Sequence, residues 1–342
     1  MKQYISPDPW LIIEDGFHPE HQKISESLFS IGNGRMGQRA NHEEGYHGET
    51  LQGSYLAGVY YPDKTRVGWW KNGYPEYFAK VLNSPNWIEI GLVIDDQPFD
   101  LRNWEIRSFR RVLNMQEGLL SRQMEIHKDN LTLRISAQRI CHYSQEDCGL
   151  VSYSVQVLEG ETNLQIASSV DADVRNSDAN YDEDFWKDRT SREIQNGLQI
   201  TCLTRKTNFQ ATYSMSNHFR HSDGQELTHT STLQDHCITQ HCRCHLKQNE
   251  SLAIDKFVIV HTSLIVEPNV QIERGNVRLG EILGQGADSL FASHRQAWAT
   301  KWAESDVQIQ GDVSAQQGIR FNMFQLHQTY RGNDTRLNIG PK

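Results

Sequence analysis

The sequence predicts a mainly β protein, a large antiparallel sandwich followed by helices. Apolar and polar residues alternate with a period of two from about residue 25 to residue 265, most clearly at residues 131–137, 150–158 and 198–203, as in half-buried strands. Turn residues separate the alternating runs at residues 128–130, 159–160, 196–197 and 223–224. Because so many strands follow one another directly, the sequence favours an antiparallel sandwich over a parallel α/β sheet.

Near residue 287 the spacing of the apolar residues changes to threes and fours, which is one face of a helix. The predicted face consists of Leu290, Phe291, His294, Trp298 and Trp302. Residues 268–286 are rich in glycine and charge, and we expect them to connect the strands to this helix.

A second helix is predicted to follow, with Asp312 or Ser314 as its N-cap and Gly332 at its end. Its apolar stripe is formed by Ile319, Met323, Leu326 and Tyr330 and widened by Phe321 and Phe324. A helix with so wide an apolar arc needs partners to cover it, and residues 287–303 offer only one. We therefore expect a further helical domain after Lys342.

Composition and charge exclude several classes of protein. The 342 residues include 34 basic and 43 acidic side chains, with a net charge of -9 and no block of Lys or Arg, which argues against a nucleic-acid partner. No apolar run approaches the roughly 20 residues of a membrane span. The first ten residues show no secretory signal, so a cytoplasmic location is expected by default. Six cysteines are too few for a disulfide scaffold.

The segment Gly32-Asn-Gly-Arg-Met-Gly37 matches the dinucleotide-binding pattern and follows a plausible strand at residues 28–31. A dinucleotide site requires a helix to open at the third glycine. Residues 41–48 contain further glycines and show no helical stripe. We therefore interpret the segment as a glycine-rich turn.

Two further clusters contain groups that bind metals elsewhere. Residues 236–245 contain three histidines and three cysteines, but their spacing alternates like a strand and does not form the paired knuckles of a zinc site. Residues 171–184 are acidic but lack the regular ligand spacing of a calcium loop. We interpret the first as ordinary strand residues and the second as a solvated loop, and predict no metal site.

Adjacent Trp69 and Trp70 lie between Gly68 and Gly73 in loop surroundings. Neighbouring residues of an extended segment point to opposite faces, so at most one ring can enter a given core. The other ring suits a sugar, whose C–H face stacks on an aromatic ring while its hydroxyls form hydrogen bonds. The alternative is that both rings pack under a missing domain or a second subunit. No Ser-His-Asp order or nucleophile elbow is present, and the carboxylates cannot be paired into acid and base from spacing alone.

Many segments in order resemble glycoside hydrolase family 65. They comprise residues 29–41, 44–45, 51–58, 68–75 and 118–122, and later Trp298, Trp302 and residues 305–306, 316–322, 324–326 and 336–342. The resemblance covers essentially the whole chain and is strongest to members that cleave maltose with phosphate. One departure is Ala40, where relatives usually carry glycine.

The resemblance implies an N-terminal β super-sandwich at residues 1–267, a helical linker at residues 268–311 and the start of an (α/α)6 catalytic barrel at residues 312–342. In the family, a donor-binding Trp-Asp-Thr-Glu segment and a general-acid Glu follow the last residues of this chain. We therefore expect the chain to be the N-terminal fragment of an enzyme, with no catalytic residue of its own, and to be inactive alone.

The implied reaction is inverting phosphorolysis, in which maltose and phosphate give β-glucose 1-phosphate and glucose. A protonated Glu donates to the leaving oxygen while phosphate attacks from the opposite face. Inorganic phosphate is then a co-substrate, and no cofactor is expected. The implied substrate-binding residues of this chain are Trp69, Trp70, Lys71, Tyr74, Arg336, Asn338 and Lys342. The implied assembly is a cytoplasmic homodimer with no nucleic-acid or membrane partner.

Three alternatives remain at this point. The same scaffold could act on trehalose or kojibiose, or it could hydrolyse its substrate, since acid trehalases share the family. The chain could also be a non-catalytic, carbohydrate-binding β module.

Overall fold

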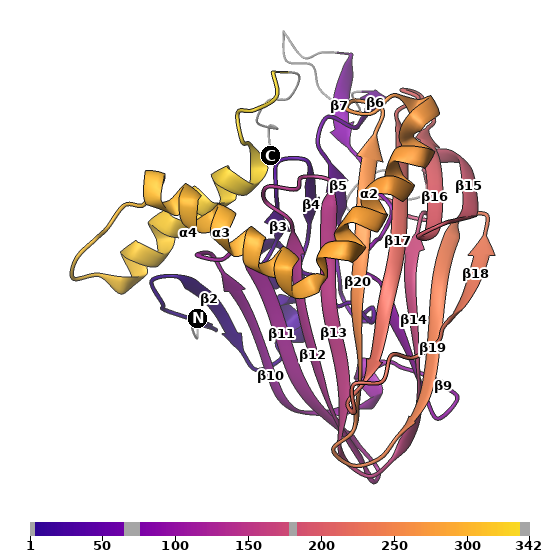
Figure 1. Ribbon diagram of the computed structural model, residues 1–342. Helices are drawn as coiled ribbons and strands as arrows, with labels where there is room; N and C mark the ends of the chain where they lie inside the picture. Colours follow the sequence, from indigo (N-terminus) through magenta and orange to yellow (C-terminus); the bar gives the residue numbers. More distant parts are fainter. Residues whose placement is uncertain (1–3, 65–75, 178–182, 336–342) are drawn as a thin grey trace.

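The structure is a computed structural model that describes residues 4–64, 76–177 and 183–335. Two antiparallel sheets face each other, and three helices near the C-terminus run across one side of them (Figure 1). This confirms the predicted mainly β fold with a large antiparallel sandwich. The division of the chain at residues 267 and 311 stays a prediction.

Within the described residues the largest sheet has ten strands, all paired antiparallel. Their order across the sheet is β1 (Ile5–Ser6), β2 (Leu11–Asp15), β10 (Glu105–Asn114), β11 (Leu119–Lys128), β12 (Leu131–Cys141), β13 (Cys148–Glu159), β20 (Ser251–Thr262), β17 (Gln210–His221), β16 (Gly197–Thr204) and β15 (Trp186–Ile194).

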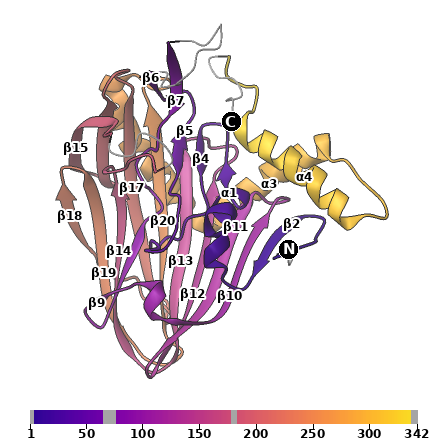
Figure 2. The same cartoon turned by 180° about the vertical axis from the view of Figure 1, so that it is seen from behind.

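A five-stranded sheet covers the inner face of the large one (Figures 1 and 2). Its order is β18 (Thr230–Gln234), β19 (Cys237–Leu246), β14 (Thr162–Asp171), β8 (Ile90–Ile94) and β9 (Gln97–Pro98). Two small sheets complete the β-structure: β3 (Ile31–Gly32), β4 (Met36–Gln38) and β5 (Ser54–Leu56) form one, and β6 (Tyr60–Lys64) and β7 (Tyr77–Val81) form the other.

Alternating side chains of facing strands fill the space between the sheets. Ile135 and Val155 of the large sheet and Ile166 of the smaller one are fully buried. The predicted turns lie between the strands, and Gly160 between β13 and β14 has a φ of 86°, a conformation that favours glycine. Period-two patterning thus located these strands correctly.

Short helical turns lie at the edges of the sandwich. They are η1 (Pro19–His21), α1 (Gln22–Leu28), η2 (Leu101–Asn103) and η3 (Pro268–Val270). Because α1 ends at Leu28, the strand expected at residues 28–31 is wrong except for its last residue, Ile31.

The segment expected only to connect strands and helices forms helix α2 (Gln271–Gln285). This helix lies across the outer face of the large sheet (Figure 1), where Leu279 and Ile282 pack with Leu150, Phe257 and Ile259. Gly275 permits the close approach, since an added Cβ would lie 2.5 Å from Ser214 Oγ on β17. Glycine here allows helix-to-sheet packing and does not mark a loop.

Helix α3 (Ala287–Ser305) buries the face that the sequence predicts. Leu290, Phe291, His294, Trp298 and Trp302 are its buried residues. An added Cβ on Gly118, which has a φ of 63°, would lie 1.9 Å from Trp298 Nε1, so only glycine fits under this ring.

Helix α4 (Val313–Thr329) begins as predicted, because the Asp312 side chain accepts a hydrogen bond from the N–H of Ala315 at 2.9 Å. Its buried face differs from the predicted stripe: Gln316, Arg320, Phe324 and Gln328 are buried, and Leu326 is 57% exposed. Arg320 pairs with Asp306 through two contacts of 2.8 Å. Gln316 and Arg320 dock the helix, because their partners lie on the turn after α3 and, for Arg320, also on the N-terminal segment.

The histidine- and cysteine-rich tract forms strand β19, which confirms the strand interpretation. In the acidic stretch, Asp184 forms ion pairs with Arg189 at 2.7 Å and Arg205 at 3.0 Å. No helix among the residues described above combines the length and the apolar character needed to cross a bilayer.

Candidate functional site

The seven residues predicted to bind substrate lie outside the described residues. Four fall within residues 65–75 and three within residues 336–342, and they are Trp69, Trp70, Lys71, Tyr74, Arg336, Asn338 and Lys342. The flanks of both segments are described, because residues 65–75 connect β6 to β7 and residues 336–342 follow helix α4.

The base of the β6–β7 hairpin and the end of α4 line one groove of about 680 Å³. The β6–β7 hairpin contributes Tyr60 and Val81, and the end of α4 contributes Gln328 and Tyr330. Strands β3, β4 and β5 also line it, and the β3–β4 turn contacts the end of α4. We name this groove, lined by these strands, the hairpin and α4, the C-terminal groove.

Aromatic and amide side chains give the C-terminal groove its chemistry. Three amides that line it have a buried atom without a hydrogen-bond partner, namely Gln38, Gln325 and Gln328. Amides both donate and accept, as sugar hydroxyls do. Among the described residues that line the groove, none carries a carboxyl, thiol or imidazole group. The charged side chains of its described lining are those of Arg35 and Arg39.

The glycine-rich motif forms the tight turn between β3 and β4, which confirms the turn interpretation. The N–H of Gly34 donates to the carbonyl of Gln328 at 2.8 Å, so the turn satisfies an unpaired carbonyl at the end of α4. An added Cβ on Gly32 would lie 3.1 Å from the same carbonyl and from that of Met36. The motif thus supports the end of the last helix.

Buried Asn33 holds this turn to the loop between β12 and β13. Its Oδ1 accepts from the N–H groups of Arg35 and Met36, both at 3.0 Å. Its Nδ2 donates to the carbonyls of His142 at 3.0 Å and Glu146 at 3.1 Å. All four contacts depend on the amide, which explains an asparagine at this place in the motif.

Glu146 anchors the chain that leaves α4. It accepts from Arg35 Nε at 2.8 Å, from Arg331 Nη1 at 2.5 Å and from Asn333 Nδ2 at 2.6 Å. Arg35 also pairs with Asp334 at 2.6 Å. Burial would lower the pKa of Arg35, but the two carboxylates raise it. The direction in which the chain enters residues 336–342 is therefore determined by side chains of the β domain.

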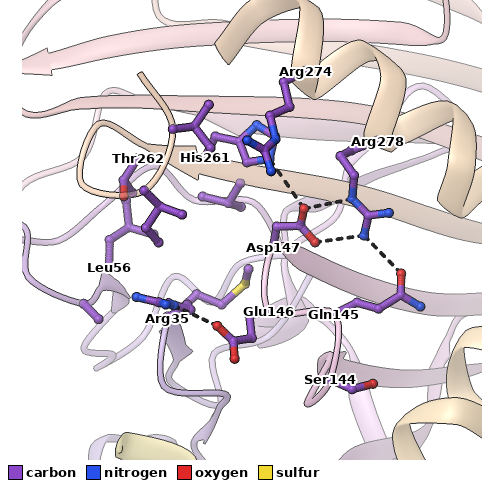
Figure 3. Close-up of a pocket in the computed structure, with 15 residues that line it drawn as sticks. Arg35, Leu56, Ser144, Gln145, Glu146, Asp147, His261, Thr262, Arg274 and Arg278 are labelled. Carbon is purple, nitrogen blue, oxygen red and sulfur yellow. Dashed lines mark hydrogen bonds and ion pairs between the residues drawn. The ribbon is translucent and has the colours of Figure 1, made fainter. Parts of the chain in front are cut away.

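A second cavity of about 400 Å³ lies beside the C-terminal groove and shares Arg35 and Leu56 with it (Figure 3). Asp147 accepts from Arg278 Nε at 3.0 Å and Nη2 at 3.1 Å, and lies 3.4 Å from His261 Nε2. Burial would raise the pKa of Asp147, but His261 and Arg278 lower it. The carboxylate stays ionised and ties α2 to the β domain, so it is unsuited to general acid catalysis.

Residues of the 41–45 and 118–122 motifs meet in a buried ion-pair network. Arg122 pairs with Glu43 at 2.6 Å and Glu44 at 2.7 Å, and Arg139 pairs with Glu43 at 2.9 Å. Burial would raise the pKa of Glu43, but Arg139 and Arg122 lower it. This network holds the loop that leads into β5 and the C-terminal groove.

Sequence reasoning missed the anchoring role of Arg35, Glu146 and Arg331. Glu146 is more than 100 positions away in the chain from both Arg35 and Arg331, and each of the three is an ordinary surface-type side chain when considered alone. Within residues 4–64, 76–177 and 183–335, no three His, Cys, Asp or Glu side chains are grouped to hold a metal ion.

The model of the glycosyl hydrolase family 65 N-terminal domain matches residues 12–301. A maltose phosphorylase from Bacillus subtilis (strain 168) is 36% identical over 340 residues, which is 98% of this chain and 44% of that protein. A kojibiose phosphorylase from Thermoanaerobacter brockii is 26% identical over 353 residues, which is 99% of this chain and 43% of that protein.

A solved structure of a proposed kojibiose phosphorylase from the human microbiome has the same fold. It superposes with a TM-score of 0.87 at 24% identity and covers 97% of this chain and 43% of that one. The chain thus spans less than half the length of the relatives it matches.

Proposed function

The chain belongs to glycoside hydrolase family 65, and on that premise we propose that it is the N-terminal part of an inverting disaccharide phosphorylase. The proposed reaction converts maltose and inorganic phosphate to β-glucose 1-phosphate and glucose. The single observation that carries this choice is the 36% identity to a maltose phosphorylase over 98% of the chain.

The chemistry of phosphorolysis explains what such a protein needs. A protonated Glu donates to the leaving oxygen, and phosphate takes the place of the activated water of an inverting glycosidase. Because phosphate is already nucleophilic, the site needs cationic and hydroxyl donors to hold the anion and does not need a second carboxylate. We place the general acid in a part of the protein that follows Lys342, and propose no metal or organic cofactor.

The β domain has a positioning role in this proposal. Trp69, Trp70, Lys71 and Tyr74 close over the sugar from the β6–β7 hairpin, and Arg336, Asn338 and Lys342 lead into the donor site. The C-terminal groove supports the proposal because it is lined by the base of the hairpin that carries the first segment and by the end of the helix that precedes the second. The anchoring of Arg331 and Asp334 supports it further, since it ties the residues just before the second segment to the β domain.

The proposed assembly is a cytoplasmic homodimer that binds a disaccharide and phosphate. Size-exclusion chromatography with light scattering on the complete protein measures the assembly. A monomer at micromolar concentration would contradict the dimer without affecting the proposed reaction.

The reaction is tested by incubating the complete protein with phosphate and maltose, trehalose or kojibiose in turn. We expect sugar phosphate from maltose. Sugar phosphate from trehalose or kojibiose but not from maltose would reject the proposed substrate and retain phosphorolysis. Glucose release at the same rate with and without phosphate would reject phosphorolysis.

The substrate contacts are tested with Lys71→Met and the matched control Lys23→Met. Lys23 is an exposed lysine on α1 that pairs with exposed Glu49 at 3.3 Å. Loss of a charged contact to a bound ligand costs about 1.5–3 kcal/mol, so we expect KM for sugar or phosphate to rise about tenfold or more in Lys71→Met only. Equal KM values for the two variants would remove Lys71 from the site.

A further inference from the structure

The end of the sandwich opposite the C-terminal groove carries another pocket, of about 480 Å³. Three tight turns surround it: Asp95 and Asp96 between β8 and β9, Asp129 between β11 and β12, and Gly160 between β13 and β14. Figures 1 and 2 show β9 in the lower part of the molecule and β6 and β7 at the top. We name this the distal pocket.

The distal pocket has an aromatic and aliphatic floor. Ile94 and Phe99 are buried, and Trp104 and Leu131 are half-buried. The rings of Phe99 and Trp104 are 5.9 Å apart between centroids. The indole Nε1 of Trp104 forms no hydrogen bond to the described residues. A volume of this size is typical of small-molecule sites, which are about 300–1,000 Å³.

Charge excludes anionic ligands from the distal pocket. Four carboxylates line it, those of Asp95, Asp100, Asp129 and Glu161, against the ammonium group of Lys128. A phosphate, a nucleotide or a sugar phosphate would be repelled by this excess of negative charge.

Two of the four carboxylates already have partners within the protein, which reduces the attraction of the pocket for an organic cation. Asp100 is paired with Arg102 at 2.7 Å, and the Asp95 side chain accepts the N–H of Asn163 at 2.8 Å. Lys128 Nζ lies 6.0 Å from the centre of the Trp104 ring, at the outer limit of a cation–π contact, and adds one positive charge to the pocket.

The polar groups that remain suit hydroxyls. Gln97, Asn103, Asn130 and Asp129 are exposed and form no side-chain hydrogen bond or ion pair to the described residues. Three of the four are amides. An amide side chain can both donate and accept hydrogen bonds, as a hydroxyl group can. Aromatic carbon beneath such groups matches a sugar ring, with an apolar C–H face and a polar edge.

We propose that the distal pocket binds a neutral oligosaccharide, with one ring stacked on Trp104 and its hydroxyls bonded to Gln97, Asn103 and Asn130. The pocket lies far from the C-terminal groove, so this inference is independent of the reaction proposed above. It assigns the β domain a carbohydrate contact that does not belong to a catalytic centre.

The test uses the chain labelled with 5-fluorotryptophan, in which Trp104→Phe identifies the fluorine signal of Trp104 among those of the eight tryptophans. Maltotriose and cellotriose are each titrated to millimolar concentration. Tetramethylammonium and sulfate are titrated separately, to represent cationic and anionic ligands. We expect a saturable shift of the Trp104 signal with at least one trisaccharide. We expect Trp104→Ala to weaken calorimetric binding at this site about tenfold or more, as for an aromatic anchor.

Substitutions of two exposed glutamines, one in the distal pocket and one elsewhere, distinguish a loss of binding from a general effect on folding. Gln97→Ala is expected to weaken binding about threefold or more, while Gln234→Ala, at an exposed strand end elsewhere, leaves it unchanged. The proposal is overturned if neither trisaccharide shifts the Trp104 signal, if tetramethylammonium or sulfate shifts it and the sugars do not, or if the two glutamine variants bind equally well.

Discussion

Helices α3 and α4 have similar lengths, 19 and 17 residues, but they bury different kinds of side chain. Helix α3 buries aromatic and aliphatic residues, with Trp298 fully buried, and forms part of the core of the sandwich. Helix α4 buries two glutamines and an arginine around a single phenylalanine, and leaves Leu326 exposed. One helix is therefore held by the hydrophobic effect and the other mainly by specific polar contacts.

This difference has a consequence for function. Apolar packing is non-directional, whereas the Arg320–Asp306 pair and the Gly34–Gln328 hydrogen bond each require one geometry. A helix held by directional contacts has a defined rotation and a defined end. In α4 these contacts fix the rotation of the helix and the position of its last turn, which precedes the proposed donor-site residues.

The largest effect is expected from removing the main aromatic residue of α3. Trp298→Ala deletes a fully buried ring that stacks 4.8 Å from Phe324 of α4. Loss of such a ring costs about 3–5 kcal/mol. Urea unfolding followed by circular dichroism measures the loss. A change below about 1 kcal/mol would show that α3 is not part of the core.

The second-largest effect is expected from acid, which should weaken the packing of α3 against the sandwich. Burial, together with the neighbouring His142, lowers the pKa of His294 to about 3. The unfolded chain has the ordinary value of about 6.5 and therefore binds a proton that the folded chain does not, so the free energy of unfolding falls as pH drops from 6.5 towards 3. The slope is up to about 1.4 kcal/mol per pH unit for this group.

Urea midpoints between pH 4 and 7 measure this slope, and His294→Gln serves as the variant without the titrating group. A slope that is unchanged in His294→Gln would assign the acid sensitivity to other residues.

Two arginines test how much the polar docking of α4 contributes. Arg320→Ala leaves Asp306 without its two contacts and should destabilise the protein by about 2 kcal/mol. Arg295→Ala on α3 removes an exposed pair with Glu117 at 3.0 Å and should cost at most about 1 kcal/mol. Equal losses in urea unfolding would contradict the idea that α4 depends on directional contacts.

The smallest effect is expected at an exposed leucine. Leu326→Ala should change stability by no more than about 0.5 kcal/mol, because the side chain is 57% exposed. The same substitution at fully buried Leu290 of α3 should cost about 2–5 kcal/mol. If Leu326→Ala proves as costly as Leu290→Ala, a partner covers the outer face of α4 in the protein measured.

The apolar periodicity of the sequence predicted the elements correctly where burial of one face in the core is the dominant effect. Strands with one face in the core alternate regularly, and the α3 stripe is correct because its apolar residues are also its buried ones. The glycine-rich turn could be recognised because no helix pattern followed it. That the base of the β6–β7 hairpin lies beside the C-terminal groove required the structure.

Apolar periodicity led to a wrong prediction, or to none, where contacts between residues far apart in the chain determine the structure. The apolar residues of α4 do not show which face is buried, since that depends on Asp306, on the N-terminal segment and on the β3–β4 turn. Helix α2 was missed because its glycines suggest a loop, although Gly275 is required for contact with β17. The pairing of Glu146 with Arg35 and Arg331 has no local signal at all.

By itself, the sequence determined the succession of strands, their turns, the apolar face of α3 and the family resemblance, because each depends on residues that are close in the chain. Only the tertiary structure decided which face of α4 is buried, which distant charges anchor its end, and that the β6–β7 hairpin and the end of α4 line one groove. These depend on residues brought together from opposite ends of the chain, and a directional ion pair or hydrogen bond leaves no periodic pattern by which its partner could be found.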